Sequence, residues 1–199
     1  MIISICNIKG GVGKTTTAIN LAYVFSKNKK VLIYDMDKQK ACGYFFDCFV
    51  EKKIMPTNNK NIDILIHKKF KKITNYDIII IDTPAGLNKA TKEAIKNSDI
   101  TIVPVLPNIL SLRTFNEMVD KGFENLKILL NGFEKKPLHK KIVELILKLP
   151  KKQYFKTYIP KSDHIEIMTL EKKSIIELMP TSNISKAYKK IAQEIMNSY

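Results

Sequence analysis

A chain of 199 residues with 45% hydrophobic residues is long enough for one domain with a sizeable core, which excludes the disordered and fibrous classes. Its 34 basic and 19 acidic residues give a net charge of +15, which favours an anionic partner such as nucleic acid or a membrane surface. Arg113 is the only arginine and the lysine excess is spread evenly, so a purely compositional origin of the charge stays open as an alternative.

The chain shows no sign of export or of membrane insertion. No apolar segment approaches the length of about 20 residues that spans a bilayer, and Lys9 interrupts the apolar start that a secretory signal requires. We therefore expect a cytoplasmic protein. Cys6, Cys42 and Cys48 match neither a metal-binding nor a redox spacing, and we interpret them as reduced thiols that pack in the core.

Short β-branched runs alternate with amphipathic stretches along the whole chain. The predicted strands are Ile2–Cys6, Val31–Tyr34, Ile62–Ile66, Ile78–Ile81, Ile100–Val105, Ile128–Leu130 and Tyr154–Ile159. The predicted helices are Lys14–Lys27, Leu87–Asn97, Ser111–Asn125, His139–Lys148 and Ile184–Met196, with a polar loop within 44–61. Continuous apolar strands are typical of parallel sheets, so we expect an α/β fold in which helices cover both faces of a mostly parallel sheet, as one domain over residues 1–199.

The first helix is preceded by a glycine-rich turn that has the features of a phosphate-binding loop. This turn follows the first predicted strand and consists of Lys9, Gly10, Gly11, Val12, Gly13, Lys14, Thr15 and Thr16. Glycines allow backbone N–H groups to converge on phosphate oxygens at a helix N-terminus. Lys14 is predicted to contact the β- and γ-phosphates and the Thr15 hydroxyl to bind Mg²⁺.

Two later strands end in carboxylates. Asp35 and Asp37 follow the second strand and are predicted to lie near the metal and the attacking water, although two solvated turn aspartates remain the alternative. Four isoleucines lead to Asp82, a Walker B pattern in which a buried strand delivers a carboxylate to Mg²⁺. Thr83-Pro84-Ala85-Gly86 forms a turn after this strand.

With the second lysine, Lys9, these motifs resemble the deviant Walker A ATPases, the P-loop family that includes the partition ATPases of the ParA and Soj type and the division-site ATPases of the MinD type. The resemblance implies a homodimer that closes on ATP, with Lys9 reaching the partner's phosphates. It also implies that Asp37 positions the hydrolytic water, that Asp35 supports Mg²⁺ or Lys14, and that the Thr83–Gly86 turn is the second switch. Lys38 stands where the family usually has proline, so a nucleotide-dependent scaffold with little turnover stays open.

The same resemblance assigns residues in the second half of the chain. Asn131 matches the residue that reads the adenine edge, although it can equally be an ordinary turn residue, and Pro160 matches the loop on the adenine face. Lys152, Lys161 and His164 fall in the stretch that binds DNA without sequence preference. The late Pro180-Thr181-Ser182 resembles the family's Pro-x-Ser before its last helix.

The resulting hypothesis is a partition ATPase that uses ATP and Mg²⁺ and hydrolyses ATP slowly. The ATP-bound dimer is expected to bind non-specific DNA on the nucleoid and to release it when a ParB-like adaptor or centromere-binding protein stimulates hydrolysis. A membrane-cycling division-site ATPase is the alternative, but the segment from Ile184 has few apolar anchors, so no stable membrane association is expected. An iron–sulfur reductase is excluded because no cysteine follows Cys48.

Overall fold

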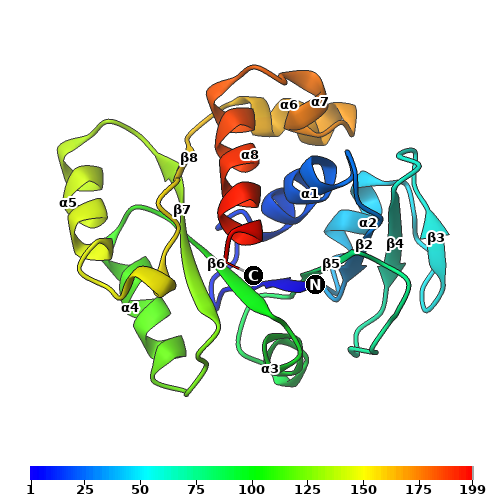
Figure 1. The fold of residues 1–199 in the computed structure, drawn as a ribbon, viewed down its shortest axis with the longest axis horizontal. Helices are drawn as coiled ribbons and strands as arrows, with labels where there is room; N and C mark the ends of the chain where they lie inside the picture. The colour runs from blue at the N-terminus through cyan, green and yellow to red at the C-terminus, as the bar shows by residue number, and fades with distance from the viewer. Residues whose placement is uncertain (199) are drawn as a thin grey trace.

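The computed structural model, which describes residues 1–198, is built around one eight-stranded sheet (Figure 1). The strands are β1 Ile2–Ile5, β2 Val31–Asp35, β3 Ile54–Pro56, β4 Ile62–Ile66, β5 Ile78–Asp82, β6 Ile100–Val105, β7 Leu126–Phe133 and β8 Ile159–Pro160. Their order across the sheet is β3-β4-β2-β5-β1-β6-β7-β8. All neighbouring strands run parallel apart from β3, which pairs antiparallel with β4, so the predicted mostly parallel α/β sheet is confirmed.

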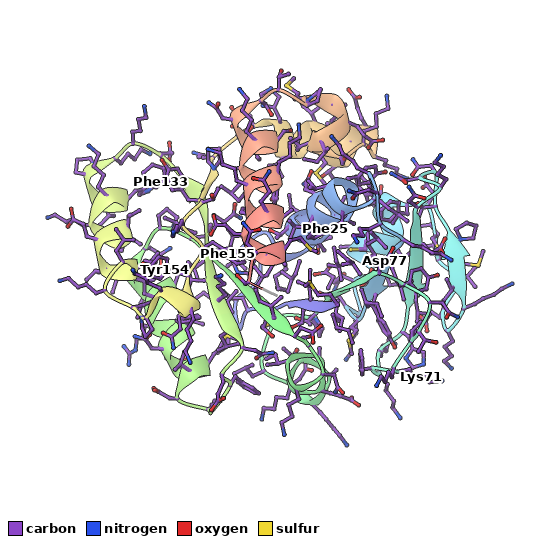
Figure 2. The ribbon with its side chains drawn as sticks, viewed as in Figure 1. Phe25, Lys71, Asp77, Phe133, Tyr154 and Phe155 are labelled. Carbon is purple, nitrogen blue, oxygen red and sulfur yellow. The ribbon has the colours of Figure 1, made fainter. Side chains whose placement is uncertain are left out.

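Helices cover both faces of this sheet, as predicted, and α1 and α8 pack on one face while α3, α4 and α5 pack on the other. The helices are α1 Lys14–Phe25, α2 Ala41–Phe45, α3 Lys89–Lys96, α4 Ile109–Val119, α5 Pro137–Ile146, α6 His164–Glu171, α7 Ile175–Leu178 and α8 Asn183–Met196, with a 3₁₀ turn at Lys151–Gln153. Every residue of β2, β5 and β6 is buried, because both faces of these strands are covered. Successive residues point to opposite faces: Phe155 belongs to the apolar cluster on the α1 face, as Phe25 does, and Tyr154 belongs to the cluster on the α4 face (Figure 2).

Some predicted boundaries are wrong, and side-chain hydrogen bonds to backbone amides explain two of them. The predicted strand Tyr154–Ile159 is reduced to an isolated bridge at Tyr154 and the short β8, because the Glu194 carboxylate accepts the amides of Lys156 and Thr157 and takes them out of the ladder. Helix α4 begins at Ile109 instead of Ser111 because the Asn108 side chain caps it by accepting from the Ser111 N–H. The predicted polar loop 44–61 contains β3, and α2, α6 and α7 were not predicted.

The carboxyl ends of β1, β2 and β5 meet at one edge of the sheet. β5 lies between β1 and β2, and the register places Asp35 beside Asp82 at the end of the paired strands. The turn after β1 opens α1, and the turns after β2 and β5 lead to α2 and α3. Ligands of open parallel sheets bind outside such carboxyl ends, so the fold indicates a binding site at this edge.

Candidate nucleotide-binding site

The turn between β1 and α1 is shaped to receive an anion. Gly11 and Gly13 have φ values of 70° and 92°, in the left-handed region that side chains rarely adopt. Gly13 is also the N-cap of α1, and no side chain of residues 1–198 caps this helix end. The first amides of α1 are therefore available to phosphate oxygens, where the positive end of the helix dipole adds to the attraction.

Asn7 holds this turn in place, although no sequence motif singles it out. Its side chain is buried, donates to the carbonyl of Pro104 at 2.7 Å and accepts the Lys9 amide at 2.9 Å. Its own carbonyl accepts the amide of Gly86 in the turn after β5. One residue thus connects the phosphate loop to β6 and to the predicted second switch. Its position directly after an apolar run is a sequence signal that could have identified it.

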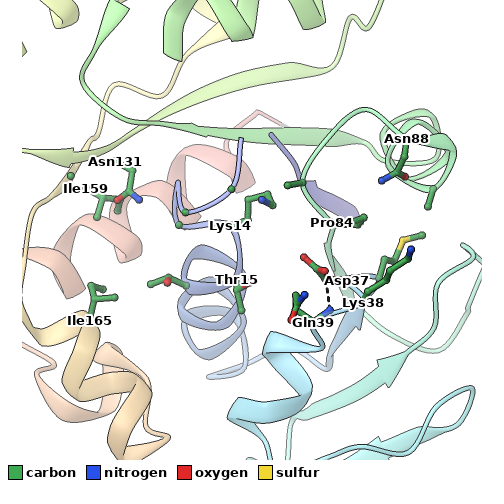
Figure 3. A pocket seen from close by; sticks show the side chains of 18 of the residues that line it. Lys14, Thr15, Asp37, Lys38, Gln39, Pro84, Asn88, Asn131, Ile159 and Ile165 are labelled. Carbon is green, nitrogen blue, oxygen red and sulfur yellow. Dashed lines mark hydrogen bonds between the residues drawn. The ribbon is translucent and has the colours of Figure 1, made fainter. Parts of the chain in front are cut away.

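A cavity of about 1090 Å³ opens along the loop and is large enough for a nucleotide (Figure 3). Its lining includes Gly10, Gly11, Gly13, Lys14, Thr15, Thr16, Asp37, Pro84, Asn131, Pro160 and Lys161. Lys14 is only 8% exposed, and its Nζ donates to the carbonyl of Lys9 at 3.3 Å. In Figure 3, Asp37 and Pro84 lie on one side of Lys14, and Asn131 and Ile159 lie on the other. The cavity therefore brings together most of the predicted nucleotide contacts.

Asp82 and Thr15 form a pair suited to Mg²⁺. Asp82 is fully buried, and its Oδ2 accepts the Thr15 hydroxyl at 2.7 Å. The Oδ1 atom of Asp82 has no hydrogen-bond partner among residues 1–198, which is costly for a buried carboxylate. Burial, and then the charge of Asp35, raise the pKa of Asp82 to about 7.

These two oxygen donors fit a magnesium site that is completed from outside the protein. The described residues contain no cluster of three or more His, Cys, Asp or Glu that could hold a metal alone. Mg²⁺ usually takes one or two protein oxygens and fills its remaining positions with phosphate oxygens and water. The orphaned oxygen of Asp82 and the hydroxyl of Thr15 are consistent with that mode of binding.

Asp35 and Asp37 lie at the start of the loop between β2 and α2, but their surroundings differ. Asp35 is fully buried, and its two oxygens accept the amides of Asp37 at 3.0 Å and of Gly43 at 3.1 Å. Burial is the main cause that raises the pKa of Asp35 to about 6. Asp37 lines the cavity and accepts the Gln39 amide at 3.0 Å (Figure 3). Asp35 thus holds the loop that presents Asp37, and its support of Mg²⁺ or Lys14 stays a prediction.

Cys42 also reaches the site, although from the sequence it is expected only to pack in the core. Its Sγ donates to Asp82 Oδ2 at 3.4 Å, and both residues are fully buried. Burial, followed by the charges of Asp82 and Asp35, raises the pKa of the Cys42 thiol well above its usual range, so this group stays a protonated donor. The contact ties α2 to the end of β5.

Asn131 and Pro160 lie at the end of the cavity opposite Asp37. Asn131 Nδ2 donates to the carbonyl of Val12 at 2.8 Å, so this side chain braces the phosphate loop. Pro160 and Lys161 line the same end of the cavity. Val12 is buried and its carbonyl is taken, so only its backbone N–H is left for a phosphate contact. Adenine contacts by Asn131 and Pro160 stay predictions.

The remaining predicted residues lie around the edge of the site or away from it. Lys9 is half-buried and, within residues 1–198, is not part of the cavity lining. Lys161 and His164 follow β8, and the His164 ring is bonded to the Ser162 hydroxyl at 2.8 Å. Lys152 lies away from Lys161 and His164. Tyr154, two residues after Lys152, pairs with Ile128 near the start of β7, whereas the Lys161 amide donates to the carbonyl of Phe133 at the end of β7. Five residues of strand separate the two points by roughly 16 Å.

The sheet, the glycine-rich turn and the Thr15–Asp82 pair together define a P-loop nucleotide-binding protein. The profile of the family described as "CobQ/CobB/MinD/ParA nucleotide binding domain" matches residues 3–175, and the chain belongs to this family. The predicted resemblance to ParA- and MinD-type ATPases is confirmed.

Relatives with assigned roles include the chromosome-partitioning ATPase Soj of Thermus thermophilus, which is 26% identical over 98% of this chain and 94% of its own length. The sporulation initiation inhibitor protein Soj of Bacillus subtilis is likewise 26% identical, over 98% of this chain and 97% of its own. These alignments extend over 235 and 249 residues, so the relatives carry segments that this 199-residue chain lacks.

Solved structures agree on the fold. A putative plasmid partition protein from Borrelia burgdorferi bound to AMPPNP is 25% identical and superimposes with a TM-score of 0.81. The superposition covers 100% of this chain and 99% of that chain. MinD of Aquifex aeolicus in a complex with MinC has a TM-score of 0.83 at 21% identity, with 98% of this chain and 95% of that chain covered. The latter likeness supports the fold alone.

Proposed function

We propose that the chain is an ATPase that dimerises on ATP, binds duplex DNA without sequence preference, and positions or segregates a cargo such as a plasmid or chromosome when an adaptor protein stimulates hydrolysis. The arrangement of the two loop lysines is the observation that carries the proposal. Lys14 occupies the cavity of its own subunit, whereas Lys9 lies outside the lining. A second cation beside Lys14 costs electrostatic free energy unless it pairs with another phosphate chain, and the nucleotide of a second subunit provides one.

The other residues have roles that follow from their positions. The loop amides and Lys14 hold the phosphates, and Asp37 orients the attacking water. Thr15 and Asp82 hold Mg²⁺, which neutralises charge on the phosphate oxygens. The turn after β5 reads the γ-phosphate, because its Pro84 and Ala85 line the cavity, while the Gly86 amide donates to the Asn7 carbonyl and holds the turn at the base of the phosphate loop.

Substitution of Lys9 and Lys14 tests the proposal. Lys14→Ala should abolish nucleotide binding, because backbone amides alone then face several phosphate charges. Lys9→Ala should keep nucleotide binding but lose the dimer that the parent forms with a non-hydrolysable ATP analogue, as measured by light scattering after size exclusion. A Lys9→Ala dimer as stable as that of the parent would refute the cross-subunit role.

A membrane-cycling ATPase is less well supported by the structure. Helix α8 packs its apolar residues, among them Tyr188 and Ile191, into the core against α1, so they are not available to a bilayer. Within residues 1–198, no helix has the length and apolar character needed to cross a membrane. The scaffold alternative rests on Lys38, and single-turnover ATP hydrolysis with and without DNA distinguishes a scaffold from a working ATPase.

A further inference from the structure

One surface of the protein carries lysines from two segments that are distant in sequence. Residues 67–73, in the connection from β4 to β5, contribute four lysines, and residues 88–98, around α3, contribute three. The seven are Lys68, Lys69, Lys71, Lys72, Lys89, Lys92 and Lys96, and we refer to them as the α3 lysine surface. Glu93 is the only acidic residue in the two segments.

The two segments lie on the same face of the sheet because both cover one apolar cluster. Phe70 stacks on Tyr34 at 5.8 Å between ring centroids, and Ala94 of α3 belongs to the same cluster. The Tyr34 hydroxyl also donates to the Lys69 carbonyl and accepts the Lys71 amide, which fixes the connection to β2. Figure 1 shows α3 and this connection along the side of the sheet away from α1 and α8, and Figure 2 places Lys71 at its margin.

The helix contributes a straight stripe of charge. Lys89, Lys92 and Lys96 are exposed and follow a spacing of three and four residues, while Ala94 and Ile95 face the core. The stripe therefore extends over roughly 10 Å along the helix axis. Duplex DNA carries one charge per ~1.7 Å of its axis, so a stripe of this length faces several phosphates.

The ion pairs within residues 1–198 leave these seven charges without a salt-bridge partner. None of the seven lysines forms an ion pair within the described part of the chain, in contrast to Lys40 and Lys172, which are paired with Glu51 and Asp47. Both segments also lack the large exposed apolar side chains that anchor a protein in a lipid surface. The Phe70 ring stacks on Tyr34, so it does not serve as a platform for an unpaired base. A surface with seven lysines outside the ion pairs of residues 1–198, and with Glu93 as its one acidic residue, best fits the backbone of a duplex.

We propose that the α3 lysine surface is a docking site for the phosphate backbone of duplex DNA, separate from the predicted site at Lys152, Lys161 and His164. The proposal rests on the proposed function in that DNA is its partner, but it assigns the contact to a different face. Lys68 and Lys89 line the nucleotide cavity as well, and α3 follows the turn that contains Pro84. The surface thus begins at the nucleotide site, next to the turn after β5.

Two charge-matched variants test this assignment. The first replaces Lys71, Lys72, Lys92 and Lys96, which are exposed and lie outside the cavity lining, with glutamine. The control replaces Lys135, Lys140, Lys141 and Lys148, which are exposed around α5, with glutamine. Each variant loses four positive charges, so both carry +11 instead of +15. A third variant combines Lys152→Gln with Lys161→Gln.

The readout is fluorescence anisotropy of a labelled duplex of arbitrary sequence, with ATP bound and over a series of salt concentrations. We expect the first variant to lose affinity on the order of 100-fold at about 0.1 M salt and the log–log salt slope to fall by about 3, while the control changes little. ATP binding and thermal unfolding are measured on all variants, so a misfolded variant is recognised and replaced by the pair Lys92→Gln and Lys96→Gln.

The possible outcomes separate this proposal from the proposed function. If the parent binds no duplex in either nucleotide state, the DNA part of the proposed function fails and the assignment fails with it. If the parent binds and the first variant binds equally well, or no worse than the control, the α3 surface is refuted while DNA binding stands. If only the variant with Lys152→Gln and Lys161→Gln loses binding, the DNA contact lies at the predicted site and the α3 lysine surface is refuted. Equal affinity for vesicles of anionic lipid would also overturn the assignment.

Discussion

Asn131 offers a quantitative test of how the phosphate loop is held. Its Nδ2 donates to the Val12 carbonyl at 2.8 Å, a contact between the end of β7 and the loop. Asn131→Ala removes one hydrogen bond, which contributes about 1 kcal/mol net in proteins. Because the loop is then less well ordered before the phosphates bind, we expect phosphate affinity to fall about fivefold.

Inorganic tripolyphosphate separates the loop from the base. It competes with a fluorescent nucleotide for the phosphate loop but carries no adenine, so its affinity reports the loop alone. ATP reports the loop and the adenine contact together. We expect Asn131→Ala to weaken both, and any further loss with ATP measures the predicted adenine contact of Asn131.

Asn125 provides a matched control. Its Nδ2 donates to the carbonyls of Ile95 at 2.9 Å and Ser98 at 2.7 Å, away from the cavity. Asn125→Ala should lower the free energy of unfolding without changing tripolyphosphate affinity. Unchanged tripolyphosphate affinity in Asn131→Ala would refute the bracing role, whatever happens to ATP.

Three further predictions concern the loop, the water and the buried carboxylates. Gly13→Ala places a Cβ 2.2 Å from Asn131 Nδ2 at a residue with φ +92°, so in urea titrations it should lower the free energy of unfolding by at least about 2 kcal/mol. Gly10→Ala is the control, because its Cβ meets no described atom within 4 Å, and it should change the free energy of unfolding little. Asp37→Ala should leave ATP bound and the dimer persistent while single-turnover hydrolysis falls about 100-fold; undiminished hydrolysis would assign the water to another group. Because burial raises the pKa of Asp82 to about 7 and of Asp35 to about 6, the nucleotide-free protein should lose stability as the pH rises from about 4 to about 7, and Asp82→Asn should flatten that profile in urea titrations.

The parts of the site that the sequence predicted are those whose signal is local. The glycine run after an apolar strand, and the four isoleucines that end in Asp82, each identify a short segment with its secondary structure. The alternation of strands and helices then predicts the parallel sheet, and the sheet brings Asp35 beside Asp82. No contact across the chain was needed for these inferences.

The parts that were missed depend on distant partners. Asn7 acts through Pro104 and Gly86, and Cys42 acts through Asp82, none of which is close in sequence. Helix α2 has only five residues, too few for a hydrophobic spacing to indicate a helix. It follows Lys40, whose backbone is in the left-handed conformation, and the Asp35 carboxylate holds it by accepting the Gly43 amide. The lost strand before β8 likewise depends on Glu194. Such contacts are decided by packing, which a single sequence does not show.

The register of β2 and β5 explains why ionised carboxylates in the ligand-free site lower the stability of the folded protein. It places Asp35 and Asp82 side by side, both fully buried, so burial raises the pKa of each carboxyl and the charge of Asp35 raises the pKa of Asp82 further. The folded state therefore binds these protons more tightly than the unfolded chain, and the stabilisation that is complete below the unfolded pKa is lost as the pH rises through about 6 and 7. A cation held by Thr15 and Asp82 favours the ionised form, and a ligand that binds only the folded state adds stability by mass action. ATP with Mg²⁺ should consequently stabilise the protein more at pH 8 than at pH 6, and an equal gain at both would mean that Asp82 does not meet the cation.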